Sequence, residues 1–181
     1  MKISKLLFLA IAVFFLSCGD DDKDPAPTGD GLAGSWTATA VEYSGTSTTK
    51  YMGETLGDAT FTGTGKDMDL TLTFNENPNT YVSKGSYTIA LKTTMAGMTT
   101  NEDRKIEEFM LPGTWAQDGK KLTITSTANG QTQTQEATIV EQTATTLKIQ
   151  WDVVINEEDY QGVEGMDLSN NTHGTYTFKR K

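Results

Sequence analysis

The sequence has a single cysteine, Cys18, and a single histidine, His173, among its 181 residues. One cysteine excludes a disulfide within the chain, and one histidine excludes a metal centre built from several imidazoles. Basic residues are also few, with 15 Lys and Arg against 24 Asp and Glu. No face rich in lysine and arginine is visible, so we expect no nucleic-acid partner. We expect no metal and no cofactor either, and solubility alone explains the acidity equally well.

Long apolar runs are also scarce, since the sequence has only one, from Leu6 to Leu16. The run follows Lys2 and Lys5 and is too short for a comfortable membrane span, which needs roughly 20 residues. A basic start before a short apolar run is typical of a secretory signal peptide, predicted here over residues 1–17. Removal of its two lysines lowers the formal net charge from −9 to −11. We expect no further membrane-crossing segment.

The end of this run, Phe15-Leu16-Ser17-Cys18-Gly19, resembles the signal of bacterial lipoproteins. In that family the chain is cut before the cysteine, whose thiol and new amino group then receive acyl chains such as palmitate. The resemblance implies that Cys18 is lipidated and that Ser17 is the small residue before the cut. Phe15 departs from the commoner aliphatic residue at its position. The alternative is an ordinary signal peptide with an accidental cysteine.

Residues 18–31 form an acidic spacer in which Asp20-Asp21-Asp22 is followed by proline and glycine. This composition predicts an extended tether that links the lipid anchor to the folded domain. A calcium site is the alternative, but the carboxylates lack the spacing of an EF-hand. An acidic run after the lipidated cysteine resembles the surface-export signal of Bacteroidetes lipoproteins. The resemblance implies a lipid-anchored outer-membrane protein exposed at the cell surface, with the periplasmic face as the alternative.

Residues 32–181 predict one all-β domain that is long enough to bury a sizeable core. Apolar and polar residues alternate through 69–75, 87–91 and 147–153, which is typical of strands. Asp118-Gly119 is a strong hairpin signal between two such runs, and no helix of convincing length is present. We expect an antiparallel up-and-down meander of about eight strands closed into a barrel. A two-sheet β-sandwich is the alternative.

The first predicted strand runs from Leu32 to Tyr43 and places Trp36 and Ala38 on one face, Val41 and Tyr43 on the other. A later strand from Tyr81 to Leu91 is expected to bend or bulge at Gly85.

Three stretches without alternation are predicted to be loops: Ser44 to Tyr51, Thr93 to Glu107, and Asn156 to Asn171. The second of these contains Met95 and Met98. Methionine side chains are flexible and polarizable, so we expect these two either to form an adaptable lid over a cavity or to fill a gap in a closed core.

Gly34-Ser35-Trp36 resembles the glycine–any–tryptophan signature of lipocalins, and Gly113-Thr114-Trp115 resembles the lipocalin-like domains of Bacteroidetes lipoproteins. The resemblance spans residues 32–181. It implies a lipocalin-like barrel in which Gly34 and Trp36 close one end and Arg180 packs across Trp36 by a cation–π contact. A plain core role for Trp36 is compatible with the same fold. The acidic loop before the last strand and the missing carboxy-terminal helix depart from lipocalins.

The sequence assembles no catalytic group. Cys18 is assigned to lipid, and His173 has no serine or aspartate partner nearby in the sequence. An exposed or capping histidine is therefore expected instead of a general base, and we expect no enzyme.

Two function classes stay open. The first is a binding module that takes a small hydrophobic or amphipathic ligand at the barrel mouth. The second is a structural or interaction module, in which side chains fill the barrel and the outer loops contact a surface protein or a glycan. The resemblance favours binding, and the candidate ligand contacts are Tyr87, Met95, Met98, Trp115 and Trp151.

Overall fold

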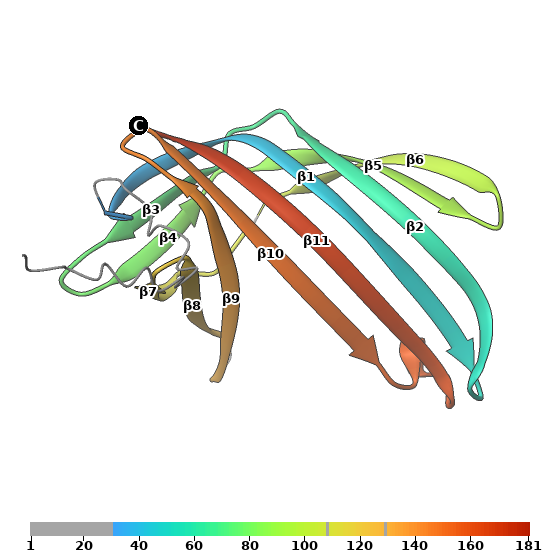
Figure 1. Ribbon diagram of the computed structural model, residues 1–181. Helices are drawn as coiled ribbons and strands as arrows, with labels where there is room; N and C mark the ends of the chain where they lie inside the picture. The colour runs from blue at the N-terminus through green and yellow to red at the C-terminus, as the bar shows by residue number, and fades with distance from the viewer. Residues whose placement is uncertain (1–30, 108, 129) are drawn as a thin grey trace, which may run out of the picture.

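A computed structural model describes residues 31–107, 109–128 and 130–181 (Figure 1). The predicted signal peptide, Cys18 and the tether up to residue 30 lie outside the described residues. The part of the chain that the structure describes contains no helix with the length and hydrophobicity needed to cross a bilayer. Its elements are β1 (Gly34–Tyr51), β2 (Glu54–Lys66), β3 (Thr71–Asn75), β4 (Thr80–Lys84), β5 (Tyr87–Met95), β6 (Met98–Ile106), β7 (Gly113–Asp118), β8 (Lys121–Ala128), β9 (Gln131–Gln142), β10 (Thr146–Glu157), the 3₁₀ turn η1 (Tyr160–Gly162) and β11 (Met166–Arg180).

The predicted barrel is present. Its strands follow one another in the order β1-β3-β4-β7-β8-β9-β10-β11, and β11 returns to pair with β1 and closes the ring. All of these pairings are antiparallel. Because neighbours around the barrel follow chain order, the topology is up-and-down. One ladder that closes on itself is not two packed sheets, so the sandwich alternative is wrong.

Strands β2, β5 and β6 lie outside the barrel. The start of β1, Gly34–Thr37, pairs with β3 in the barrel, but its second half, Glu42–Tyr51, pairs with β2. The sheet then continues through β5 to β6. Figure 1 shows these strands, together with the far ends of β1, β10 and β11, as a long curved extension of the barrel wall. β6 is the edge strand of this extension. Its exposed charged residues 102–105 hinder pairing of this edge with strands of other chains.

The three predicted loops are wrong in whole or in part. Ser44–Tyr51 is the second half of β1, residues 93–107 form most of the β5–β6 hairpin, and β11 begins at Met166. The first two of these stretches are rich in threonine, which favours strands without adding an apolar face. Residues 44–51 are paired on both edges, by β11 and by β2. Hydrogen bonds to both neighbouring strands therefore stabilise these residues as a strand, although their sequence shows no alternation of apolar residues.

Gly85 divides the long strand predicted from Tyr81 to Leu91 into β4 and β5. Its φ of +87° lies in the region that favours glycine. A Cβ atom at this position would overlap the carbonyl oxygen of Asp69. The expected bend is therefore present, and it is sharp enough to end one strand and begin the next outside the barrel.

A β-bulge in β1 changes which residues face the interior. The register with β11 shifts between Ala38 and Ala40, and an extra residue reverses the alternation of faces beyond it. Val41 is therefore buried, and Tyr43 packs against the same core as Trp36. The prediction that Val41 and Tyr43 face away from Trp36 is wrong for this reason.

The core fills the barrel from one end. Leu70, just before β3, and side chains from β1, β3, β8, β9, β10 and β11 meet there. Each is at most 1% exposed: Trp36, Leu70, Leu72, Phe74, Leu122, Ile139, Leu147, Ile149 and Phe178. Burial of so much apolar surface is the main force that holds the closed barrel together. Open space inside the barrel is therefore expected toward the other end.

Candidate functional site

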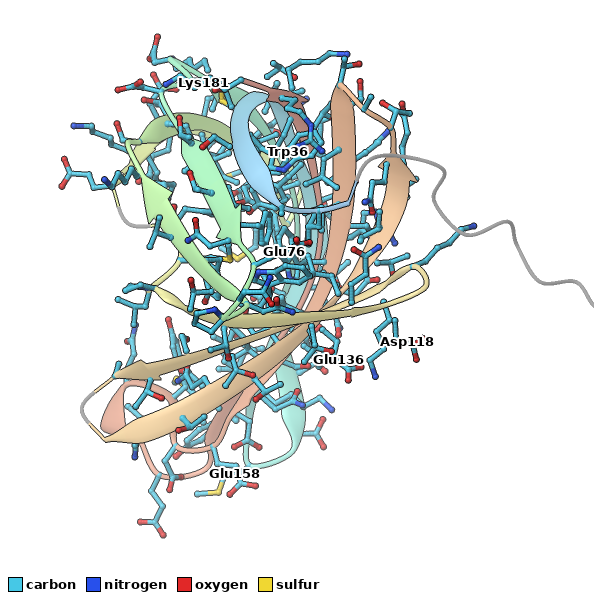
Figure 2. The ribbon with its side chains drawn as sticks, turned by 90° about the vertical axis from the view of Figure 1, so that its left-hand side faces the viewer. Trp36, Glu76, Asp118, Glu136, Glu158 and Lys181 are labelled. Atoms are coloured by element: carbon cyan, nitrogen blue, oxygen red, sulfur yellow. The ribbon has the colours of Figure 1, made fainter. Side chains whose placement is uncertain are left out.

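Trp36 and Arg180 seal the closed end, as the resemblance implies. The indole N–H of Trp36 donates to the Leu32 carbonyl at 2.9 Å, and Arg180 Cζ lies 4.3 Å from the centroid of the Trp36 ring. Arg180 Nη1 also donates to the Ala33 carbonyl at 2.7 Å. A Cβ atom on Gly34 would lie 2.6 Å from Nη1, so the glycine makes room for the guanidinium. Figure 2 shows Trp36 at the end of the barrel where Lys181 also lies.

The opposite end opens because β9 and β10 diverge. They pair from Leu147 and Gln142 only as far as Gln150 and Thr138, while β10 continues along β11 to Glu157. Trp151 is the first residue of β10 beyond this pairing. A cavity of about 240 Å³ lies at this mouth, and its lining is Tyr43, Tyr87, Ile106, Phe109, Met110, Gln135, Trp151, Val153, Thr172, Gly174 and Tyr176.

Two of the five predicted ligand contacts, Tyr87 and Trp151, meet in this cavity. Trp115 is buried elsewhere. Its ring packs edge-to-face on Phe74 with the centroids 5.8 Å apart, and its indole N–H donates to the Asn75 carbonyl at 2.9 Å. Trp115 is part of the buried core and does not line the cavity at the mouth, so it is not placed as a ligand contact there.

Met95 and Met98 form neither a lid nor core filling. They are a register pair at the tip of the β5–β6 hairpin and are 52% and 70% exposed. Ala96 and Gly97 have positive φ values of 50° and 76° and make the tight turn between them. The predicted loop is therefore only this turn, and it holds both methionines away from the barrel mouth.

Three tyrosine hydroxyls meet at the inner wall of the cavity. The Tyr43 hydroxyl lies 2.7 Å from that of Tyr87 and also forms a hydrogen bond with that of Tyr176. Burial raises the pKa of Tyr87 and of Tyr176 well above the ordinary value of 10.0, so both remain neutral phenols. Three hydroxyls share two mutual hydrogen bonds, which leaves one hydroxyl proton to donate elsewhere.

Phe109 is the centre of the aromatic lining. Its ring centroid lies 4.7 Å from that of Tyr176, 5.9 Å from that of Trp151 and 6.1 Å from that of Tyr87. Its backbone belongs to the connection between β6 and β7, outside the strands. Edge-to-face and tilted aromatic contacts of this kind are individually modest, about 0.5–1.5 kcal/mol each. The ring is thus held by side-chain packing and not by strand pairing.

Trp151 carries an unsatisfied donor. The side chain is 6% exposed, and its Nε1 has no hydrogen-bond partner. Among the residues that the structure describes, every other buried side-chain nitrogen or oxygen has one. Trp36 and Trp115, by contrast, both donate to backbone carbonyls. A buried donor without an acceptor costs about 1–3 kcal/mol, and such an atom in a native site calls for an explanation.

The cavity continues onto the concave face of the extension. A second hollow of about 350 Å³ shares Tyr43, Ile106 and Thr172 with the first. It extends the lining along β2, β5, β6 and β11 through Phe61, Ile89, Leu91, Thr93, Arg104 and Asn170. A largely apolar surface thus runs without a break from the barrel mouth along the outer strands.

Sequence reasoning missed Tyr43, Phe109 and Tyr176. The bulge conceals Tyr43, since a strict period of two assigns it to the outer face. Phe109 lies in the connection between β6 and β7, where no strand alternation places its side chain. Tyr176 was detectable, because it shares a face with Phe178 on the last strand.

His173 is exposed, as predicted, and lies outside this cavity. Its Nδ1 pairs with Asp152 Oδ1 at 2.7 Å across β10 and β11. The hydrogen bond from His173 lowers the pKa of the Asp152 carboxyl. Among residues 31–107, 109–128 and 130–181, no group of three or more His, Cys, Asp or Glu side chains is placed to hold a metal ion.

Comparisons with protein-family models, with curated proteins and with solved structures each give no match to this chain.

Proposed function

We propose that this protein is a lipid-anchored lipoprotein of the outer membrane that binds a small hydrophobic or amphipathic ligand at its barrel mouth and performs no catalysis. The observation that carries the proposal is the cavity at the divergence of β9 and β10. Aromatic and aliphatic side chains line it, and a few polar groups converge on it. That combination is typical of sites for small molecules.

The anchor rests on the sequence. Cys18 stands where the apolar run ends, and the acidic residues that follow favour the cell surface over the periplasmic face. Growth with a labelled fatty acid tests the anchor. We expect label on the wild-type protein and none on Cys18→Ser, which should also leave the membrane fraction. Equal labelling of the two proteins would refute lipidation at Cys18.

Binding at the mouth is tested with the uncharged fluorescent dye N-phenylnaphthylamine. We expect saturable binding of one dye per chain. Val153 lines the cavity, so Val153→Trp should fill the mouth and weaken dye binding by about tenfold or more, the effect of roughly 1.4 kcal/mol of lost contact.

Val154→Trp is the matched control. Val154 is the next residue of β10, 65% exposed and outside the cavity lining, so this variant should bind the dye like the wild type. Equal weakening in both variants, or no saturable binding to the wild type, would refute a ligand site at the mouth.

One observation favours the interaction module as a second candidate. Beyond Gln150, β10 has β11 on one side but no longer pairs with β9, and Val153, Val154 and Ile155 there are 36%, 65% and 45% exposed. Apolar side chains on such an edge suit the addition of a strand from another protein. In that case Val154→Lys should abolish co-purification of a surface protein without any effect on dye binding.

A further inference from the structure

The described side chains that line the cavity of about 240 Å³ at the barrel mouth offer hydrogen-bond donors but no charge, and the charged side chain of the adjoining hollow, Arg104, is paired with Glu102. Among residues 31–107, 109–128 and 130–181, none of those that line the cavity is acidic, basic or histidine. The polar groups there are the indole N–H of Trp151, the one hydroxyl proton left over by Tyr43, Tyr87 and Tyr176, the Gln135 carboxamide, and the Thr172 hydroxyl, which donates to Asn170. A charged group buried among these side chains would lose its hydration without gaining a counter-ion, which is strongly unfavourable.

We propose that the ligand is an uncharged, ring-bearing compound whose carbonyl or ether oxygen accepts a hydrogen bond from Trp151 Nε1. This inference rests on the proposed function and names the ligand class of the same site. The rings of Trp151 and Tyr176 suit a flat apolar partner, because they already hold the Phe109 ring by edge-to-face and tilted contacts that a flat ligand ring can reproduce. The acceptor oxygen removes the cost of the unsatisfied indole donor.

Movement of the Phe109 side chain opens access for the ligand to Trp151. Trp151 Nε1 is buried, so an acceptor reaches it only when a neighbouring side chain moves. The Phe109 ring contacts Trp151, Tyr87 and Tyr176 from outside the strands, and Phe109 also lines a neighbouring cavity of about 270 Å³ with Tyr81 and Ile124. The ring therefore has space to turn aside, and the ligand takes its place against Trp151.

Three matched probes test the ligand class: naphthyl methyl ketone, isopropylnaphthalene and naphthoate. They share a ring system and differ in carrying a neutral acceptor, no acceptor or a negative charge. Binding is measured by equilibrium dialysis on the protein with Cys18→Ser, so that no attached lipid takes up the probes. We expect the ketone to bind about fivefold to tenfold more tightly than the hydrocarbon, and naphthoate to bind at least about tenfold more weakly than the ketone.

Indole N–H signals in a proton–nitrogen correlation spectrum locate the hydrogen bond. The chain has three tryptophans, and Trp36 and Trp115 serve as internal references because each already donates to a carbonyl. Saturation with the ketone should move the Trp151 signal downfield and leave the other two in place. Trp151→Phe should bring the ketone-to-hydrocarbon preference to about one, whereas Trp115→Phe should leave it unchanged.

The outcomes separate the two proposals. Hydrocarbon binding equal to that of the ketone, tighter binding of naphthoate, or a Trp151 signal that does not move with the ketone would each overturn the ligand class. The ligand site itself would stand in these cases, provided that Val153→Trp still blocks the probe. If no probe binds and N-phenylnaphthylamine does not bind either, both the ligand class and the proposed function fail.

Discussion

Loss of Arg180 should destabilise the whole barrel, because this side chain ties the first and last strands together at the closed end. It stacks on Trp36 and donates hydrogen bonds to the carbonyls of Ala33, Ala144 and Gly31 at 2.7, 2.8 and 2.9 Å. A partly desolvated cation–π contact contributes about 0.5–2 kcal/mol. The carbonyls lie near the surface and can bind water when the guanidinium is removed, so only part of the usual 1.5–3 kcal/mol per charged hydrogen bond is lost. We expect Arg180→Ala to lower the free energy of unfolding by about 2–4 kcal/mol.

Urea denaturation followed by tryptophan fluorescence measures this loss. Arg180→Lys keeps the charge but not the planar fork of donors, so it should recover about half of the loss. Arg104→Ala is the control, since Arg104 is 60% exposed and pairs with the exposed Glu102; its removal should cost about 0–1 kcal/mol. A loss below about 1 kcal/mol for Arg180→Ala, or full stability of Arg180→Lys, would refute the role assigned to the guanidinium.

Three further predictions follow from single residues. Gly85→Ala should prevent folding or cost more than about 3 kcal/mol, because its Cβ overlaps the Asp69 carbonyl; Gly119→Ala, with a φ of +57° and open space around it, should cost only about 1 kcal/mol in the same denaturation assay. The phenols of Tyr87 and Tyr176 have raised pKa values, so the stability they contribute is complete below pH 10.0, the ordinary tyrosine pKa, and falls above it as the unfolded chain ionises first. Ultraviolet titration of phenolate should then show these two ionising together with unfolding, and reversible ionisation in the folded protein would contradict their burial. Protonation of Asp152 removes its pairing with His173. Because this pairing lowers the pKa of Asp152, its contribution to folding stability is present above pH 3.8, the ordinary value, and is lost as the pH falls below it. Acid denaturation of His173→Gln should therefore show a smaller loss of stability over that range than the wild type.

The closed end of the fold was predictable because its signals are local. Leu70, Leu72 and Phe74 alternate cleanly with threonine, and burial of one face follows directly from that pattern. Asp118-Gly119 specifies a tight turn by its own conformational preference. The contact of Arg180 with Trp36 followed from the resemblance to lipocalins and is present at 4.3 Å.

The extension and half of the site were not predictable, because long-range pairing determines them. Threonine-rich strands such as the second half of β1 become strands only through their neighbours, and no apolar face marks them. The bulge after Ala38 turns Tyr43 toward the interior, and a shift of one residue leaves no sign in the composition. The residue type of Met95 and Met98 suggested a lid or the filling of a closed core, but a tight hairpin turn holds both side chains in solvent.

Native mass spectrometry of the protein, released from the membranes of its own organism, tests the central claim most directly. We predict a reproducible bound mass on the wild-type chain that is released on denaturation. This mass should be absent from Val153→Trp and retained by Val154→Trp. A wild-type chain that carries no additional mass, and takes up neither N-phenylnaphthylamine nor naphthyl methyl ketone, would contradict a ligand site at the barrel mouth.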